Sequence, residues 1–207
     1  MEFNLALMGA EASGKSAAIR AISEIEVLDT EQVATDGLSV GNVSTTVAMD
    51  VGVISLREGN RIRLYGTPGR KRFDFMWDIV LQQCDGVLLV INHAKETRVT
   101  DLDFYWREAR ARSGSRGLPV VVCISHVDQN PSVPLSVYSD YFRHGHGMGG
   151  SDMPPIMSMD TRKSPQVRSA LIAMTALLEM RQRFERDPRG RAAGASLVME
   201  HEKQHAH

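Results

Sequence analysis

Apolar and polar positions along the chain follow two periods, short apolar runs typical of strands and longer mixed segments typical of helices. The apolar runs predict strands at about residues 3–8, 46–56, 61–65, 86–91, 119–124 and 155–158. The mixed segments predict helices at about residues 15–24, 70–83, 98–112, 135–143 and 166–186. Strands that alternate with helices indicate an α/β fold with a mostly parallel sheet.

A short turn at Glu58-Gly59-Asn60 joins the second and third of these strands. Such a turn is too short for a parallel crossover, so it predicts an antiparallel hairpin. We therefore expect a mostly parallel six-stranded sheet with one antiparallel hairpin and helices on both faces. The hydrophobic period is lost after Pro188, and we expect one domain at residues 1–183 followed by a polar, disordered tail at 184–207.

The first strand leads into Gly9–Ser16, which fits G-x-x-x-x-G-K-[ST], and a helix follows. This strand-loop-helix context is the one that a phosphate-binding loop (P-loop) requires. Backbone N–H groups and the helix N-terminus of such a loop hold phosphate oxygens. Lys15 would reach the β and γ phosphates, and the Ser16 hydroxyl would ligate Mg²⁺. We predict a nucleoside triphosphate site that includes Gly9, Glu11, Ala12, Ser13, Gly14, Lys15, Ser16 and Ala17.

The composition excludes several classes of function. The chain has 207 residues, a net charge of -1 and a pI near 6.7, without the basic excess of a nucleic-acid-binding protein. No apolar run has the length of a transmembrane segment, and the N-terminus has no signal-peptide pattern. Cys84 and Cys123 lie in apolar runs and are interpreted as reduced core residues. We expect a cytoplasmic protein.

Three strings beyond the P-loop resemble the Ras-like small GTPases. They are Thr45–Gly52, Tyr65–Gly69 and Phe73–Asp78, and they are most similar to the bacterial branch associated with roadblock-domain proteins. The resemblance covers about residues 1–183. It implies a Ras-like G domain of the P-loop NTPase class that binds GTP or GDP with Mg²⁺ and acts as a molecular switch.

The same resemblance implies a partner of the roadblock/LC7 type. It would contact switches I and II, the segments that respond to the γ-phosphate, and the surface around Phe73, Phe75 and Trp77. Bulky apolar residues in this position are also typical of the core side of a helix. Four of them in five positions exceed one helix face, however, so we expect some to be exposed or covered by the partner.

The resemblance also implies individual roles. Thr46 matches the switch I threonine that closes on Mg²⁺ and the γ-phosphate, although a β-branched residue also suits a strand. Gly69 matches the glycine whose backbone N–H contacts the γ-phosphate.

A base-reading segment is implied after the last two strands. Within Ser125-His126-Val127-Asp128, Asp128 matches the aspartate that accepts from guanine N1–H and the exocyclic amine, and His126 replaces the usual lysine. Asp128 could instead be a turn residue before Asn130-Pro131. Ser158 and Met159 fall where backbone groups touch the guanine oxygen.

Three positions depart from the family pattern. Gly66 stands where most relatives carry an aspartate for Mg²⁺, so Asp50 on the neighbouring strand is a candidate metal residue, or else a solvated strand residue. Arg70 replaces the glutamine that orients water; it would stabilise phosphoryl charge, or simply lie on an exposed basic surface. Glu11 would crowd the γ-phosphate.

These departures predict a slow GTPase, stimulated by its partner, with Lys15, Thr46 and Arg70 as catalytic residues and Ser16, Thr46 and Asp50 at the metal. Two alternatives remain. One is a non-hydrolysing pseudo-GTPase scaffold that binds nucleotide for partner assembly. The other is a small-molecule kinase with a P-loop, which would prefer adenine.

Overall fold

A central sheet organises the fold in the computed structural model, which describes residues 2–29, 49–55, 61–69 and 73–186. Its seven strands lie in the order β2-β3-β4-β1-β5-β6-β7. The strands are β1 Glu2–Met8, β2 Leu28–Asp29, β3 Asp50–Ser55, β4 Arg61–Gly66, β5 Gly86–Asn92, β6 Val120–Ser125 and β7 Ile156–Ser158. The helices are α1 Lys15–Ile22, α2 Phe75–Gln83, α3 Arg98–Ser113, α4 Ser136–Asp140 and α5 Ser164–Arg186. Short helical turns lie at Gly114–Arg116, Val127–Gln129, Tyr141–Gly145 and Gly150–Asp152.

The sheet is mostly parallel, as predicted. Strand β1 pairs in parallel with β4 and β5, and the parallel order continues through β6 to β7. Strands β3 and β4 form the predicted antiparallel hairpin, in a register that pairs Asp50 with Gly66. The structure adds β2, a two-residue edge strand antiparallel to β3. The sequence did not predict it because two residues are too few to show a period.

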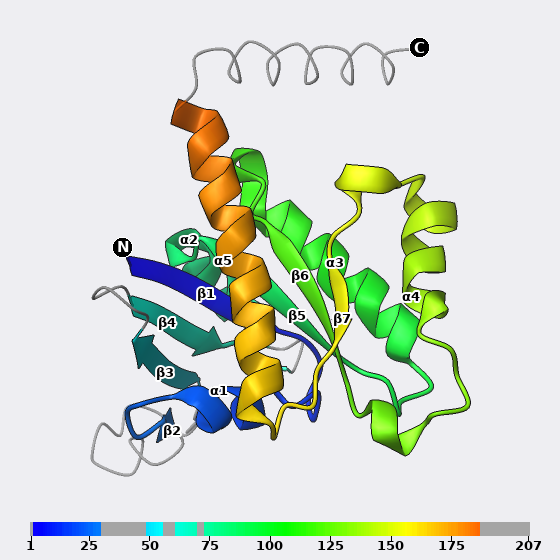
Figure 1. The fold of residues 1–207 in the computed structure, drawn as a ribbon, viewed down its shortest axis with the longest axis horizontal. Coiled ribbons are helices and arrows are strands. Elements are labelled where there is room, and N and C mark those ends of the chain that lie inside the picture. Colours follow the sequence, from blue (N-terminus) through cyan, green and yellow to red (C-terminus); the bar gives the residue numbers. More distant parts are fainter. Residues whose placement is uncertain (1, 30–48, 56–60, 70–72, 187–207) are drawn as a thin grey trace, which may run out of the picture. The chain divides into compact units, whose positions relative to one another are not determined.

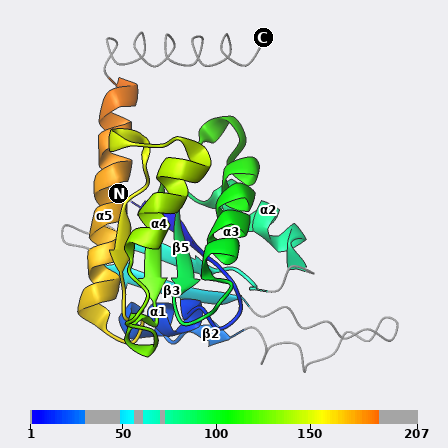
Figure 2. The same cartoon turned by 90° about the vertical axis from the view of Figure 1, so that its right-hand side faces the viewer.

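Helices cover both faces of the sheet (Figures 1 and 2). On one face, Gly52 and Gly66 leave room for Ile19 of α1, and Gly86 leaves room for Met174 of α5. On the other face, α2 and α3 pack on β1 and β5. Residues up to Met174 form one compact unit. Thr175 begins a second unit, of which the structure describes 175–186, the C-terminal part of α5.

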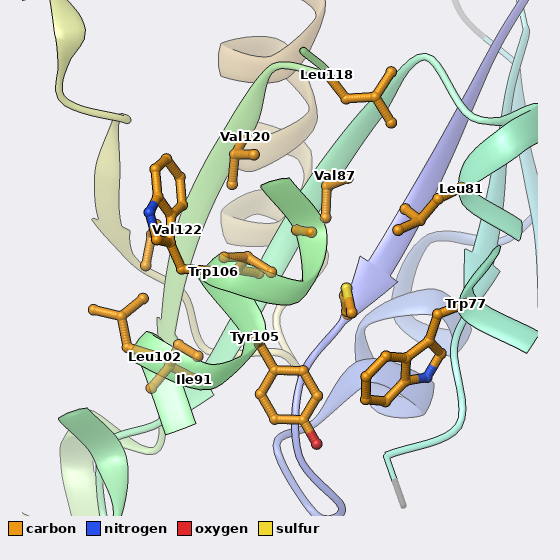
Figure 3. Packing of buried hydrophobic residues seen from close by; sticks show 14 of the residues in the cluster. Trp77, Leu81, Val87, Ile91, Leu102, Tyr105, Trp106, Leu118, Val120 and Val122 are labelled. Atoms are coloured by element: carbon orange, nitrogen blue, oxygen red, sulfur yellow. The ribbon is translucent and has the colours of Figure 1, made fainter. Parts of the chain in front are cut away.

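Aliphatic side chains and a few aromatic ones form the core between the sheet and the helices α2 and α3 (Figure 3). Trp77 of α2 is fully buried, and its ring centroid lies 5.6 Å from that of Tyr105 on α3. Cys84 and Cys123 are buried free thiols, which confirms their prediction as core residues. In the described part of the chain, no helix combines the length and apolar character needed to cross a membrane.

Candidate functional site

The P-loop runs from β1 to α1 and is packed closely on both sides. A Cβ atom on Gly9 would lie 2.2 Å from the Val90 carbonyl oxygen of β5. Gly14 has a φ of 97°, and a Cβ there would lie 2.7 Å from Thr161 Oγ1, beyond β7. Both positions therefore require glycine for space, and Gly14 also for its left-handed backbone. This packing holds the loop at the carboxyl edge of the sheet, where ligands bind in open α/β folds.

Lys15 lies beneath the P-loop with a 7% exposed side chain. Its ammonium group donates to the Gly9 and Ala10 carbonyl oxygens at 2.7 and 2.8 Å. Burial lowers the pKa of Lys15 from 10.5 to about 8, while the negative charge of Asp50 partly opposes this change. An anion bound in the loop would favour the charged form of Lys15. The Lys15 ammonium group thus lies within the P-loop, and its contact with phosphate stays a prediction.

Three side chains from the ends of β5 and β6 hold the P-loop carbonyl groups. Asn92 Nδ2 donates to Ala12 O at 2.9 Å, and Lys95 Nζ donates to Glu11 O at 2.7 Å. Ser125 Oγ donates to Ser13 O at 2.8 Å. These bonds fix the loop conformation before any ligand binds.

Sequence reasoning missed Asn92 and Lys95, which belong to no motif that it used. A usable signal was their place at and just beyond the end of β5, because β5 adjoins β1 in the sheet. Lys95 also brings a second positive charge to the neighbourhood of Lys15, where it contributes to the lowered pKa of Lys15. Two cations beside the loop favour an anionic ligand.

The Ser13 hydroxyl of the P-loop is a buried polar group that a ligand could bond. Among the described residues, Ser13 Oγ makes no hydrogen bond although it is buried. Buried polar atoms in proteins nearly always have a partner. Ser16 and Ala17, at the start of α1, are partly exposed next to the loop. The orphan hydroxyl and the buried ammonium both fit a phosphate group as ligand.

Gly69 packs backbone to backbone on the P-loop, and its contact with a γ-phosphate stays a prediction. A Cβ atom on Gly69 would lie 2.4 Å from the Glu11 nitrogen. Two core aromatic residues hold this segment: Trp77 Nε1 donates to Pro68 O and Tyr105 OH donates to Gly69 O, each at 2.9 Å. The segment Pro68–Gly69 is therefore fixed from the side of α2 and α3.

Asp50 lies beside the space that a side chain at position 66 would enter. A Cβ atom on Gly66 would lie 3.3 Å from Asp50 Oδ2. The other carboxylate oxygen lies 3.8 Å from Arg20 Nη2 of α1. Ser16 and Arg20 are four residues apart and share a face of that helix, so Asp50 lies along the side of α1 that carries Ser16.

No group of three His, Cys, Asp or Glu side chains in the described ranges is arranged to hold a metal. One carboxylate beside a hydroxyl and phosphate oxygens still suits Mg²⁺. This ion usually keeps several waters and takes only one or two protein carboxylates. Asp50 and Ser16 fit such a site.

The predicted base-reading segment lies beside the P-loop. His126 has a φ of 55°, and its Nδ1 lies 2.9 Å from Ser125 Oγ. Asp128 is exposed, and its carboxylate accepts a hydrogen bond from Arg162 Nη2 at 3.2 Å. Arg162 and its neighbour Thr161 were missed because the family motif was followed only to Ser158 and Met159, which precede them.

The predicted contact of Ser158 and Met159 with the guanine oxygen stays a prediction. The backbone N–H of Met159 donates to Ile124 O at 2.8 Å. The next N–H, of Asp160, donates to Gln166 Oε1 at 2.7 Å. These bonds extend the pairing of β6 with β7 and attach the loop to α5, so neither N–H is directed to a ligand. Ser158 is exposed at the end of β7.

The remaining predicted residues either lie outside the described ranges or differ in burial. Thr46 and Arg70 lie outside the described residues, so their roles stay predictions. Trp77 is fully buried and Phe73 is 8% exposed, which makes both core residues rather than open surface. Phe75 is 55% exposed and is the member of that group available for contact with a partner.

A family model described as "conserved hypothetical ATP binding protein" matches residues 20–205, most of the chain. ADP-ribosylation factor-related protein 1 is 23% identical over 92 residues in Rattus norvegicus and 24% identical in Homo sapiens. That stretch covers 44% of this chain and 45% of each relative, so the alignment spans less than half of these curated relatives. The uncharacterized protein MJ1339 of Methanocaldococcus jannaschii is 36% identical over 50 residues, 24% of this chain and 32% of that protein.

Proposed function

The chain belongs to the family described as conserved hypothetical ATP binding proteins, and from this premise we propose that it is a GTP-binding molecular switch. It binds GTP with Mg²⁺ and hydrolyses it slowly to GDP. The observation that carries the proposal is the packing of Gly69 on Glu11 of the P-loop above a buried Lys15. A switch needs this arrangement, because the γ-phosphate must be sensed by the loop and by switch II together. The similarity to ADP-ribosylation factor-related protein 1 and the strand order around β1 support it.

The choice of guanine over the adenine of the family description rests on Asp128. A carboxylate accepts hydrogen bonds and donates none when ionised. Guanine offers two donors on its Watson–Crick edge, N1–H and the exocyclic amine. Adenine offers an unprotonated N1 there, which a carboxylate repels. Asp128 lies on a loop attached to the P-loop through Ser125, which supports a place for it beside the base in this proposal.

Ser16, Thr46 and Asp50 are the residues that would hold Mg²⁺. The bound ion would supply positive charge to the β and γ phosphate oxygens. Lys15, Lys95 and the backbone N–H groups of the loop would stabilise the remaining phosphate charge during in-line attack by water. These groups neutralise charge, but none of them orients the attacking water.

Slow hydrolysis follows from the residues that stand around the attacking water. Arg70 has no acceptor for a water proton, and Glu11 brings a carboxylate to the γ-phosphate side of the loop. A partner that completes the site can raise the rate by orders of magnitude. We propose a roadblock-type partner that contacts the switches and the exposed Phe75.

Single-turnover phosphate release tests this proposal. The purified chain is loaded with GTP and Mg²⁺, and release is followed alone and with a roadblock-domain protein. We expect slow release alone and faster release with the partner. Fast release by the chain alone contradicts the slow-switch proposal. Tight binding without release under either condition establishes the alternative, a non-hydrolysing scaffold.

A further inference from the structure

We infer that Arg162 determines specificity in the base pocket, where it donates hydrogen bonds to the guanine O6 atom while Asp128 accepts from the opposite end of the same base edge. The inference rests on the proposed function, because it assigns the second half of guanine recognition. It assigns this role to a side chain in place of the backbone group that the family resemblance implied.

The guanidinium group of Arg162 is held by two carboxylates. Its Nε and Nη2 donate to the two oxygens of Asp160 at 2.8 and 3.0 Å, and Nη2 also donates to Asp128 Oδ2 at 3.2 Å. The Arg162 backbone N–H donates to Asp160 Oδ1 at 3.1 Å. Two parallel bonds to one carboxylate fix the plane of a guanidinium. Asp160 thus orients the guanidinium group of Arg162 so that Nη2 also reaches Asp128.

The loop that carries Arg162 is anchored at the triphosphate site. Thr161 is 5% exposed and packs on Gly14 of the P-loop. Asp128 follows β6, whose last residue, Ser125, bonds to Ser13 of the same loop. The pair Asp128–Arg162 therefore connects the two loops that follow the neighbouring strands β6 and β7, both tied to the P-loop.

The backbone leaves the oxygen of the base without its expected donor. The N–H groups of Met159 and Asp160 donate to Ile124 and Gln166. An arginine side chain has five N–H donors, and the bonds to Asp128 and Asp160 use only Nε and Nη2 among the described residues. Arginine is also the side chain most often found on O6 and N7 of guanine in protein–DNA complexes.

The pair complements guanine and opposes adenine. Asp128 offers acceptors for N1–H and the exocyclic amine, and Arg162 offers donors for O6. Adenine presents an acceptor and a donor in the reverse positions. A different interpretation makes Arg162–Asp128 a surface ion pair that contributes little and must open before a base can bind. The two interpretations predict opposite effects when Arg162 is removed.

The test compares Arg162→Ala with Lys163→Ala by equilibrium titration with GTP, inosine triphosphate and ATP. Lys163 is a matched control because it is as exposed as Arg162 and also pairs with Asp160, at 3.6 Å, but no contact joins it to Asp128 in the described residues. Inosine triphosphate keeps O6 and N1–H and lacks the amine. We expect Arg162→Ala to weaken GTP and inosine triphosphate about tenfold each and to leave ATP unchanged. Lys163→Ala should change none of the three.

Two further variants separate the roles of the pair. Arg162→Lys keeps the charge and loses the planar fork, so it should recover only part of the lost affinity. Asp128→Ala should weaken GTP more than inosine triphosphate, because only GTP carries the amine. Thermal unfolding of each variant without nucleotide shows whether its fold is retained.

Three results overturn the inference. An equal loss for all three nucleotides assigns Arg162 to the phosphates, and tighter GTP binding by Arg162→Ala makes it a barrier to the base. Unchanged selectivity in Arg162→Ala, with wild type still preferring GTP, removes the role of Arg162 and leaves the proposed function standing. If wild type itself does not prefer GTP over ATP, the guanine assignment of the proposed function fails first.

Discussion

Asp50 and Gly66 face each other across the antiparallel pair of β3 and β4, and a side chain on Gly66 would meet the Asp50 carboxylate at 3.3 Å. The Asp50 carboxylate of β3 therefore lies beside the space that a carboxylate at position 66 of β4 would enter. Related small GTPases that carry an aspartate at the position of Gly66 are expected to use it for Mg²⁺. We propose that in this chain Asp50 of the neighbouring strand supplies that charge.

Exchanging the two residues tests this relationship. Asp50→Asn should weaken Mg²⁺ binding to the nucleotide-loaded protein about tenfold, as loss of a supporting carboxylate does at other metal sites. The double exchange Asp50→Gly with Gly66→Asp should recover much of that affinity. Gly66→Asp alone should destabilise the fold, because two carboxylates would crowd one space. Magnesium titration measures all three variants, with the exposed Asp152→Asn as control; normal Mg²⁺ affinity in Asp50→Asn would remove Asp50 from the site.

Nucleotide binding should take up a proton near pH 8.5. The pKa of Lys15 is lowered to about 8 by burial, so part of its population is neutral at that pH, and phosphate favours the charged form. Affinity should therefore fall as the pH rises above about 8, by up to about tenfold per pH unit. The same lowered pKa makes the free energy of unfolding without nucleotide rise between pH 8 and 10.5, because the unfolded chain binds the extra proton there.

Calorimetric titration in two buffers of different ionisation heat measures the proton uptake. Lys15→Arg is the control, since a guanidinium stays charged at this pH and should bind nucleotide without uptake. A wild-type binding heat that does not depend on the buffer at pH 8.5 would falsify the assignment of Lys15 as the titrating group.

Tyr105→Phe should loosen switch II with little damage to the core. The change removes the hydroxyl that donates to Gly69 O and keeps the buried ring. We expect the free energy of unfolding to drop by about 1 kcal/mol and the preference for GTP over GDP to decrease, because Gly69 would be held less firmly near the γ-phosphate. Tyr138→Phe is a matched control, since that buried hydroxyl bonds His93 instead, at 2.7 Å. An equal change in nucleotide preference in both variants would contradict a specific role for Tyr105.

Both cysteines should be unreactive while the protein is folded. Burial raises the pKa of the Cys84 and Cys123 thiols to about 12, and Asp85 adds to the shift at Cys84. Since only the thiolate reacts, labelling by a disulfide reagent at pH 8 should be limited by unfolding. The free energy of unfolding should also fall as the pH rises above 9, because the thiols ionise in the unfolded chain before they ionise in the folded one. Rapid labelling of either single-cysteine variant under native conditions would be inconsistent with this burial.

The strand and helix order could be predicted because apolar runs with clear periods mark each main element. The P-loop could be predicted because its glycines and lysine form a local string. The contacts of Lys95 with Glu11 and of Arg162 with Asp128 could not, since they join residues 84 and 34 positions apart. Burial of Trp77 was ambiguous for another reason. Apolar residues in α2 exceed one helix face, and only packing shows that Trp77 points inward and Phe75 outward.

The affinity of the purified full chain for GTP and ATP, measured by equilibrium titration with Mg²⁺ at pH 7, tests whether the site selects guanine. Asp128→Ala is measured in parallel. The account predicts clearly tighter binding of GTP than of ATP by the wild-type chain, with most of that difference lost in Asp128→Ala. Equal or tighter binding of ATP, unaffected by Asp128→Ala, would contradict it and assign the site to adenine nucleotides.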